Sequence, residues 1–163
     1  MNSTDVRSRA QTRPSLALRP ALVRQVAMAD SCPTFKTVSS GEAKGLQWCD
    51  VKVGDGESPV PKAFIKAHYT GSLDSEMASG VFDSSYDRRK PLGFMVGTHQ
   101  VISGWDLGIL GDGNELPAMK AHGVRKLVLP PNLAYGERGA GGVIPPNATL
   151  YFDIEYLGRL GQK

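Results

Sequence analysis

The sequence has few of the features that would identify a membrane protein or a nucleic-acid-binding domain. No window contains the run of about 18 apolar residues that a membrane-spanning helix needs. The net charge is only +3, and residues 1–31 account for all of it with five arginines against two aspartates. Residues 32–163 hold 14 basic and 14 acidic side chains. Such a neutral segment lacks the basic face that follows a phosphate backbone, so we expect no nucleic-acid partner.

Metal-binding residues are also scarce. The three histidines lie far apart along the chain, and the only two cysteines, Cys32 and Cys49, are too widely spaced for a C-x-x-C motif. A zinc site needs four ligands, so we expect no metal and no cofactor. A disulfide between the cysteines would stabilise the fold by roughly 3 kcal/mol and would require an oxidising compartment. The cysteines alone leave a disulfide and two free thiols equally open.

The familiar catalytic motifs are missing too. There is no G-x-S-x-G sequence for a nucleophilic serine. The glycine-rich stretch 136–142 departs from G-x-G-x-x-G and has no P-loop lysine after it. The chemistry of this protein should therefore need no nucleophile, metal or nucleotide.

Residues 1–31 differ in composition from the rest of the chain. They contain no glycine and no aromatic residue, so they cannot form a core that offsets their ordering entropy, and we expect them to be disordered. One interpretation is a solvated tail, and the other is a basic targeting leader ending in the small-x-small sequence Ala27-Met28-Ala29. Arg19 and Arg24 interrupt the apolar stretch, which favours an organellar over a secretory signal. Residues 32–163 are long enough for one ordinary domain.

The pattern after residue 31 predicts short strands and one brief helix. Ala63, Ile65, Ala67 and Tyr69 alternate with more polar residues, which is typical of a half-buried strand. The other strands are predicted over 46–53, 81–82, 92–96, 124–129 and 149–157. Residues 101–110 have apolar side chains near helical spacing, with Ser103 placed to cap the helix. One helix against an antiparallel sheet is an α+β fold.

Large apolar residues also gather in segments that should not be buried. Tyr135 lies in a loop rich in glycine and proline that runs to Pro146, and loops lie mostly at the surface. Each aromatic residue on its own is explained by a plain core. Together, those on the loop and near the helix start also suit an apolar cleft with a few polar groups.

These residues lie in a series of runs that resembles the FKBP family of peptidyl-prolyl cis-trans isomerases. The runs, in order, are Ala67-His68-Tyr69-Thr70-Gly71, Val81-Phe82-Asp83-Ser84-Ser85, Lys90-Pro91-Leu92, Val101-Ile102-Ser103-Gly104-Trp105, Leu133-Ala134-Tyr135-Gly136 and Ile144-Pro145-Pro146-Asn147-Ala148-Thr149-Leu150. Their order and spacing match the family over residues 42–158. The resemblance implies a five- to six-stranded antiparallel sheet wrapped around one short helix, in agreement with the strand prediction.

The resemblance also implies an activity, a pocket and a set of partners. The activity is isomerisation of X-Pro bonds in client proteins, without a cofactor; the alternative is a binding module of the same fold that docks a client or assembly factor. The implied catalytic residues are Tyr69, Phe82, Asp83, Trp105, Tyr135 and Phe152. The implied substrate-binding residues are Arg88, Phe94, Val101, Ile102, Val143 and Ile144. Macrolides such as tacrolimus and rapamycin are possible ligands, and we expect a monomer.

Two positions depart from the family pattern at the rim of the pocket. Leu92 replaces an aromatic residue and Ala140 a bulkier polar one, which favours a changed ligand selectivity.

The chain is more similar still to the FKBPs of the plant and algal thylakoid lumen. The shared features include Cys32, the segment Gly45-Leu46-x-x-Cys49-Asp50 and the sequence Phe152-Asp153-Ile154-Glu155-Tyr156. In those proteins the matching cysteines form a disulfide, so the resemblance implies a Cys32–Cys49 bridge. It also implies a chloroplast location, in the thylakoid lumen. The relatives carry a second cysteine pair where this chain has only residues 140–143, so redox control through that pair is not implied here.

Overall fold

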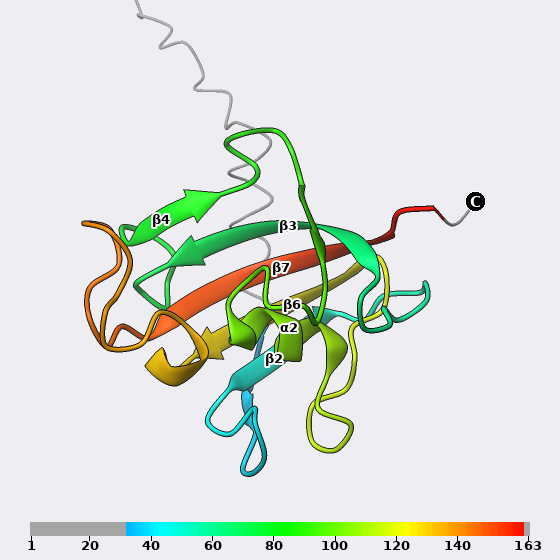
Figure 1. Ribbon diagram of the computed structural model, residues 1–163, viewed down its shortest axis with the longest axis horizontal. Coiled ribbons are helices and arrows are strands. Elements are labelled where there is room, and N and C mark those ends of the chain that lie inside the picture. The colour runs from blue at the N-terminus through cyan, green and yellow to red at the C-terminus, as the bar shows by residue number, and fades with distance from the viewer. Residues whose placement is uncertain (1–31, 162–163) are drawn as a thin grey trace, which may run out of the picture.

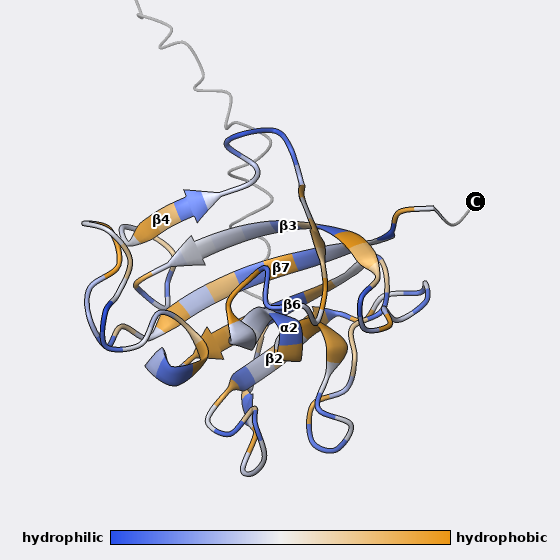
Figure 2. Cartoon of the chain, viewed as in Figure 1, coloured by the Kyte–Doolittle hydropathy of each residue, from blue (hydrophilic) through white to orange (hydrophobic). Residues whose placement is uncertain are grey.

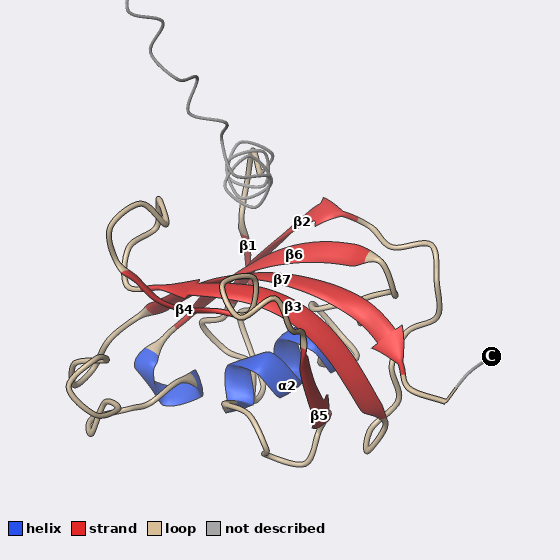
Figure 3. Ribbon diagram, turned by 90° about the horizontal axis from the view of Figure 1, so that it is seen from above, coloured by secondary structure: helices blue, strands red, loops and turns tan. Residues whose placement is uncertain are grey.

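Alternating apolar and polar residues build most of the structure. The computed structural model describes residues 32–161, which form one antiparallel sheet with a helix against one of its faces (Figure 1, Figure 3). The strands are β1 (Lys36–Thr37), β2 (Gln47–Lys52), β3 (Phe64–Ser72), β4 (Val81–Ser84), β5 (Leu92–Met95), β6 (Gly123–Leu129) and β7 (Leu150–Arg159). The helices are α2 (Ser103–Leu110) and the 3₁₀ turn η1 (Pro131–Leu133).

The sheet order brings strands from both ends of the chain together. It runs β1-β2-β6-β7-β3-β4, and β5 pairs with β3 beside β4. Strands β3 and β7, far apart in sequence, lie side by side in the middle of the sheet (Figure 1). All these pairs are antiparallel, which confirms the predicted fold class. Strand β1, with only two exposed residues, has no periodic signal and was not predicted.

The helix begins later than predicted. Val101 and Ile102 precede it, and Ile102 occupies the N-cap position with extended backbone. The prediction that Ser103 caps the helix is wrong, because no side chain makes a capping hydrogen bond at this end. Ser103 lies one position too late: the backbone carbonyl of Ile102 already accepts the Trp105 N–H, at 2.9 Å.

The core fills the space between the sheet and α2. Along β7, Leu150, Phe152, Ile154 and Tyr156 are buried on the helix side, and polar and apolar segments alternate along this strand (Figure 2). Helix α2 approaches β6 closely because it presents glycine there. A Cβ atom at Gly104 would lie 2.5 Å from Leu129 Cδ1. The close approach sets the depth of Trp105, the next residue of the helix.

A buried arginine fixes the far end of α2 against the sheet. Arg125 on β6 is 1% exposed, and its Nε donates to Asp50 Oδ1 at 2.6 Å. Its Nη1 donates to the carbonyl oxygens of Gly108 and Pro117, at 2.8 and 2.7 Å. A buried charge is tolerated only when it is paired and hydrogen-bonded, and these contacts satisfy that condition. They join β2, β6, α2 and the segment after the helix.

A disulfide joins the start of the described chain to β2. Cys32 and Cys49 are bonded, with their Cα atoms 6.0 Å apart, as the family resemblance implies. Cys49 lies opposite Lys126 of β6, whose Nζ is 2.9 Å from Asp153 Oδ1. Asp153 alternates with the core residues Phe152 and Ile154, so the disulfide lies on the face of the sheet away from α2.

The proposed leader, residues 1–31, lies outside the described residues. Within residues 32–161, no helix has the length and apolar character needed to cross a membrane. The same part of the chain contains no group of three or more His, Cys, Asp or Glu residues arranged to hold a metal ion.

Candidate functional site

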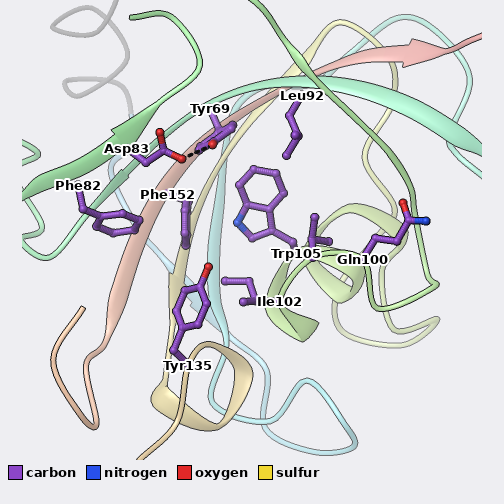
Figure 4. Close-up of a pocket in the computed structure, with 10 residues that line it drawn as sticks. Tyr69, Phe82, Asp83, Leu92, Gln100, Ile102, Trp105, Tyr135 and Phe152 are labelled. Atoms are coloured by element: carbon purple, nitrogen blue, oxygen red, sulfur yellow. Dashed lines mark hydrogen bonds between the residues drawn. The ribbon is translucent and has the colours of Figure 1, made fainter. Parts of the chain in front are cut away.

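A pocket of about 160 Å³ opens beside the start of α2. Side chains from four strands, the helix and two loops converge on it (Figure 4). The lining residues are Tyr69, Phe82, Asp83, Leu92, Gln100, Val101, Ile102, Trp105, Tyr135 and Phe152. The indole of Trp105 lies in the middle of this group, between Leu92 and Ile102 (Figure 4).

Aromatic rings hold Trp105 in place. Its ring makes edge-to-face contacts with Tyr69 and Phe152, with centroids 4.8 and 5.3 Å apart. Such pairs contribute about 0.5–1.5 kcal/mol each beyond the burial of their area. Trp105 is 3% exposed, so the floor of the pocket is rigid and apolar.

The side wall depends on a glycine of β3. Phe82 and Phe152 meet edge to face, with centroids 5.8 Å apart. A Cβ atom at Gly71 would lie 2.6 Å from Phe152 and 2.7 Å from Phe82, closer than real contacts allow. The absence of a side chain at Gly71 therefore makes room for both rings.

One wall of the pocket is charged. The Tyr69 hydroxyl donates to Asp83 Oδ2, and Arg88 Nη1 donates to Asp83 Oδ1 (Figure 4 shows the first of these bonds). Arg88 Nη2 closes the triangle by donating to the Tyr69 hydroxyl oxygen at 2.7 Å. Asp83 comes from β4, Tyr69 from β3, and Arg88 from the turn after β4.

The triangle sets the protonation states of its members. Partial burial by itself would raise the pKa of Asp83, but hydrogen bonds from Tyr69 and Arg88 outweigh it and hold this pKa below its ordinary value. Burial, with the hydrogen bond to the Asp83 carboxylate, raises the pKa of Tyr69. At neutral pH Asp83 is an anion and Tyr69 a neutral donor.

Several hydrogen-bond donors surround the apolar floor. The Tyr135 hydroxyl points into the space between Phe152 and Ile102 (Figure 4). No hydrogen bond within residues 32–161 uses the backbone N–H of Ile102. Trp105 Nε1 is buried and has no hydrogen-bond partner among the described residues. The site thus combines an apolar floor with donors free to meet carbonyl groups.

The loop before α2 is tied to the helix and to β5. The buried carboxylate of Asp106 accepts the backbone N–H groups of Gly97 and His99, at 2.7 and 3.0 Å. Gln100 Oε1 accepts the Met95 N–H at 2.9 Å. These bonds position Val101 and Ile102 at the pocket before any ligand enters.

The structure brings most of the sequence-predicted site residues together, but not all of them. Phe94 packs against Trp105, with ring centroids 5.9 Å apart, and is 3% exposed. Ile144 is buried under the loop after Tyr135, and Val143 is 58% exposed. None of these three lines the pocket, and Arg88 reaches it only through Asp83 and Tyr69.

Sequence reasoning missed one lining residue. Gln100 is an exposed polar residue in a loop, and no periodicity or motif distinguishes it. The one available signal was its position next to Val101. Leu92, noted from the sequence only as a departure at the rim, lines the pocket directly.

Comparison with known proteins gives consistent matches. The model of a family described as FKBP-type peptidyl-prolyl cis-trans isomerase matches residues 55–157. A chloroplastic peptidyl-prolyl cis-trans isomerase of Arabidopsis thaliana, FKBP13, is 51% identical over 120 residues. That match covers 71% of this chain and 56% of the Arabidopsis protein, so the chain spans little more than half of that relative's length.

Two further matches cover nearly the whole of the other protein. An FK506-binding protein of Neisseria meningitidis is 48% identical over 108 residues, which is 66% of this chain and 90% of that protein. The crystal structure of AtFKBP13 superposes with a TM-score of 0.70 at 47% identity, covering 77% of this chain and 98% of that one.

Proposed function

Since the chain belongs to the FKBP-type peptidyl-prolyl cis-trans isomerase family, we propose that it accelerates the cis–trans isomerisation of X-Pro bonds in client proteins. The observation that carries the proposal is the pocket itself. An apolar floor formed by Trp105 is enclosed by aromatic walls, and it is accompanied by donors that have no partner within residues 32–161. The size and character of this space suit a proline ring with the amide that precedes it.

The chemistry requires no covalent step. Rotation about a peptide bond crosses a barrier of about 18–20 kcal/mol because amide resonance resists twisting. Without a catalyst an X-Pro bond isomerises in about 10–100 s. The twisted amide has lost much of its charge-separated resonance form, so an apolar site destabilises it less than the planar amide. A pocket that excludes water therefore binds the transition state better than the ground state.

Each part of the pocket has a role in this proposal. Trp105, Phe82 and Phe152 hold the proline ring. The Ile102 N–H and the Tyr135 hydroxyl orient carbonyl groups of the substrate on either side of the twisting bond. Val101 encloses the ring near the start of α2, and Phe94 supports the floor from behind. Val143 and Ile144 act through the loop that carries Tyr135.

Asp83 has an organising role in this mechanism. Both of its carboxylate oxygens are engaged by Tyr69 and Arg88, and its lowered pKa keeps it ionised. It is therefore poorly suited to donate a proton to the proline nitrogen. Its negative charge is part of the pocket wall. There it fixes Tyr69 and interacts with the carbonyl group of the substrate's X-Pro bond as the amide twists.

Replacing Asp83 by alanine should lower kcat/KM by roughly five- to tenfold and leave measurable turnover, because one set of charge-assisted hydrogen bonds is lost while the apolar floor remains. Asp83→Asn is the matched control, since it keeps the shape and loses the charge. Because the pKa of Asp83 is lowered, wild-type turnover should not change on its account between about pH 5 and 8. Complete loss of activity in a folded Asp83→Ala protein would instead assign Asp83 an essential chemical role.

The proposed function is tested by following cis-to-trans conversion of a short X-Pro peptide in the presence of the purified full-length chain. Acceleration over the spontaneous rate supports an isomerase. A folded protein that captures proline-containing clients through this pocket without accelerating the peptide would instead be a binding module.

Relatives carry the name FK506-binding protein, so we propose that the same pocket binds the macrolide FK506, which is tacrolimus. Leu92 offers this ligand a smaller apolar surface than an aromatic residue would, so tacrolimus and rapamycin should bind more weakly than to members with an aromatic at that position.

The chain works as a monomer in this proposal, because the pocket is complete within one copy.

We propose that the protein is imported into the chloroplast and delivered to the thylakoid lumen. The chloroplastic relative and the disulfide support this location. The targeting leader would lie within the basic residues 1–31, and cleavage after Ala29 would remove it. Sequencing the N-terminus of the protein recovered from its organelle should place residue 30 first. A mature N-terminus elsewhere would contradict this processing site.

A further inference from the structure

The open edge of β5 next to the pocket has unpaired backbone groups. Within residues 32–161, β5 pairs only with β3, so its other edge has no neighbouring strand (Figure 3). Val96 exchanges hydrogen bonds with the β3 side, through Ala63 and Lys62. Backbone N–H and carbonyl groups point to alternate sides along a strand. The backbone groups of Phe94 and Leu92 therefore also point toward β3, whereas those of Gly93 and Met95 point outward.

Only Gly93 is left open on this edge. The Met95 N–H donates to Gln100 Oε1 at 2.9 Å, and the Met95 carbonyl accepts from Thr98 Oγ1 at 2.8 Å. Gly93 is exposed, and the alternation along β5 directs its N–H and its carbonyl oxygen away from β3; no hydrogen bond outside the strand ladder in the described part of the chain uses either group. Such a pair of groups is what an extended peptide needs in order to add as a further strand.

Side chains around Gly93 could receive alternate residues of an added strand. On one face, Phe64 and Met95 lie opposite each other across the two strands and are 44% and 36% exposed. The Phe64 ring lies over Gly93, where a Cβ atom would come within 2.9 Å of it. On the other face, Leu92 lines the pocket together with Gln100.

We propose that the client segment flanking the proline adds as an antiparallel or parallel strand to the β5 edge at Gly93, while the proline occupies the pocket. This rests on the proposed function and identifies the substrate class as proline sites with an adjoining extended, unpaired segment. Leu92 and Gly93 are consecutive residues, so a peptide leaving the pocket needs only a few residues, at about 3.3 Å each, to reach the edge. The neighbouring edge of β4 is less suited, since a bulge interrupts its pairing with β3.

The test compares a tetrapeptide X-Pro substrate with peptides extended by six residues on the N-terminal or the C-terminal side of the proline. With the wild-type chain, one extension should raise kcat/KM roughly three- to tenfold, the equivalent of one or two hydrogen bonds. Gly93→Pro removes the N–H and should abolish this gain. The matched control, Gly93→Ala, places the same Cβ against Phe64 but retains the N–H and the gain. The tetrapeptide should be turned over equally by all three proteins.

A second measurement does not depend on the variants folding. Methylating the backbone nitrogens of the favoured peptide one at a time should remove the gain at one position only, the nitrogen whose N–H donates to the Gly93 carbonyl oxygen. A gain that persists in folded Gly93→Pro, or equal turnover of short and extended peptides, would overturn the inference and leave the isomerase intact. A wild-type dimer that Gly93→Pro dissociates would also overturn it, because a second copy would then occupy the edge. No turnover of the tetrapeptide would contradict the proposed function itself.

Discussion

Replacing Trp105 by alanine is expected to lower kcat/KM for a short X-Pro peptide by roughly 30- to 100-fold. Full burial of an apolar group the size of a proline ring contributes about 1.5–3 kcal/mol, and each 1.4 kcal/mol corresponds to a tenfold change in rate. Without the indole, the ring would have no floor to pack against. The substitution also removes the edge-to-face contacts with Tyr69 and Phe152 that hold the walls.

The variant must remain folded for this result to be informative. Truncating a buried tryptophan costs about 3–5 kcal/mol of stability, so the assay belongs well below the melting temperature of the variant, with circular dichroism recorded under the same conditions. Trp105→Phe is the matched control because it keeps an aromatic floor and loses Nε1–H, which has no partner within residues 32–161. We expect it to retain activity within about tenfold of the wild type, since the floor contributes mainly through its apolar area. Turnover of folded Trp105→Ala within threefold of the wild type would show that the proline ring binds elsewhere.

Breaking the Cys32–Cys49 bridge is expected to lower the melting temperature by roughly 10 °C. The cysteines are separated by 17 residues, and in the chain-entropy model closing such a loop contributes about 3 kcal/mol. Thermal unfolding in the presence and absence of reductant measures the loss. The Cys32→Ser, Cys49→Ser double variant should have the lower melting temperature in both conditions.

Catalysis should survive the same change. No lining residue of the pocket comes from β2, and Cys49 lies on the sheet face away from α2. At 25 °C, kcat/KM should therefore stay within about twofold of the wild type while the protein remains folded. Loss of turnover on reduction, with an unchanged circular dichroism spectrum at the assay temperature, would contradict this separation. It would show that the disulfide controls the pocket through the sheet.

The strands and the chemical character of the site could be predicted from sequence because both depend on local order. Side chains alternate along a strand, so β3 and β7 were recognisable from Ile65, Ala67, Phe152 and Ile154 alone. The aromatic and acidic residues of the pocket lie in short runs that retain a family pattern. That pattern was enough to indicate an isomerase fold, and the matched family confirms it.

The contacts across the sheet were decided only by the tertiary structure. The register between β3 and β4 places Asp83 beside Tyr69, and nothing in either segment specifies this pairing alone. The polar Gln100 belongs to the pocket because its loop folds back on β5, whereas the apolar Phe94 lies behind the floor. The sequence by itself determined the elements and the types of residue available for the site. Which of them meet depended on strand pairing and on how closely the glycine face of α2 lets Trp105 approach the sheet, since both are contacts between residues far apart in the chain.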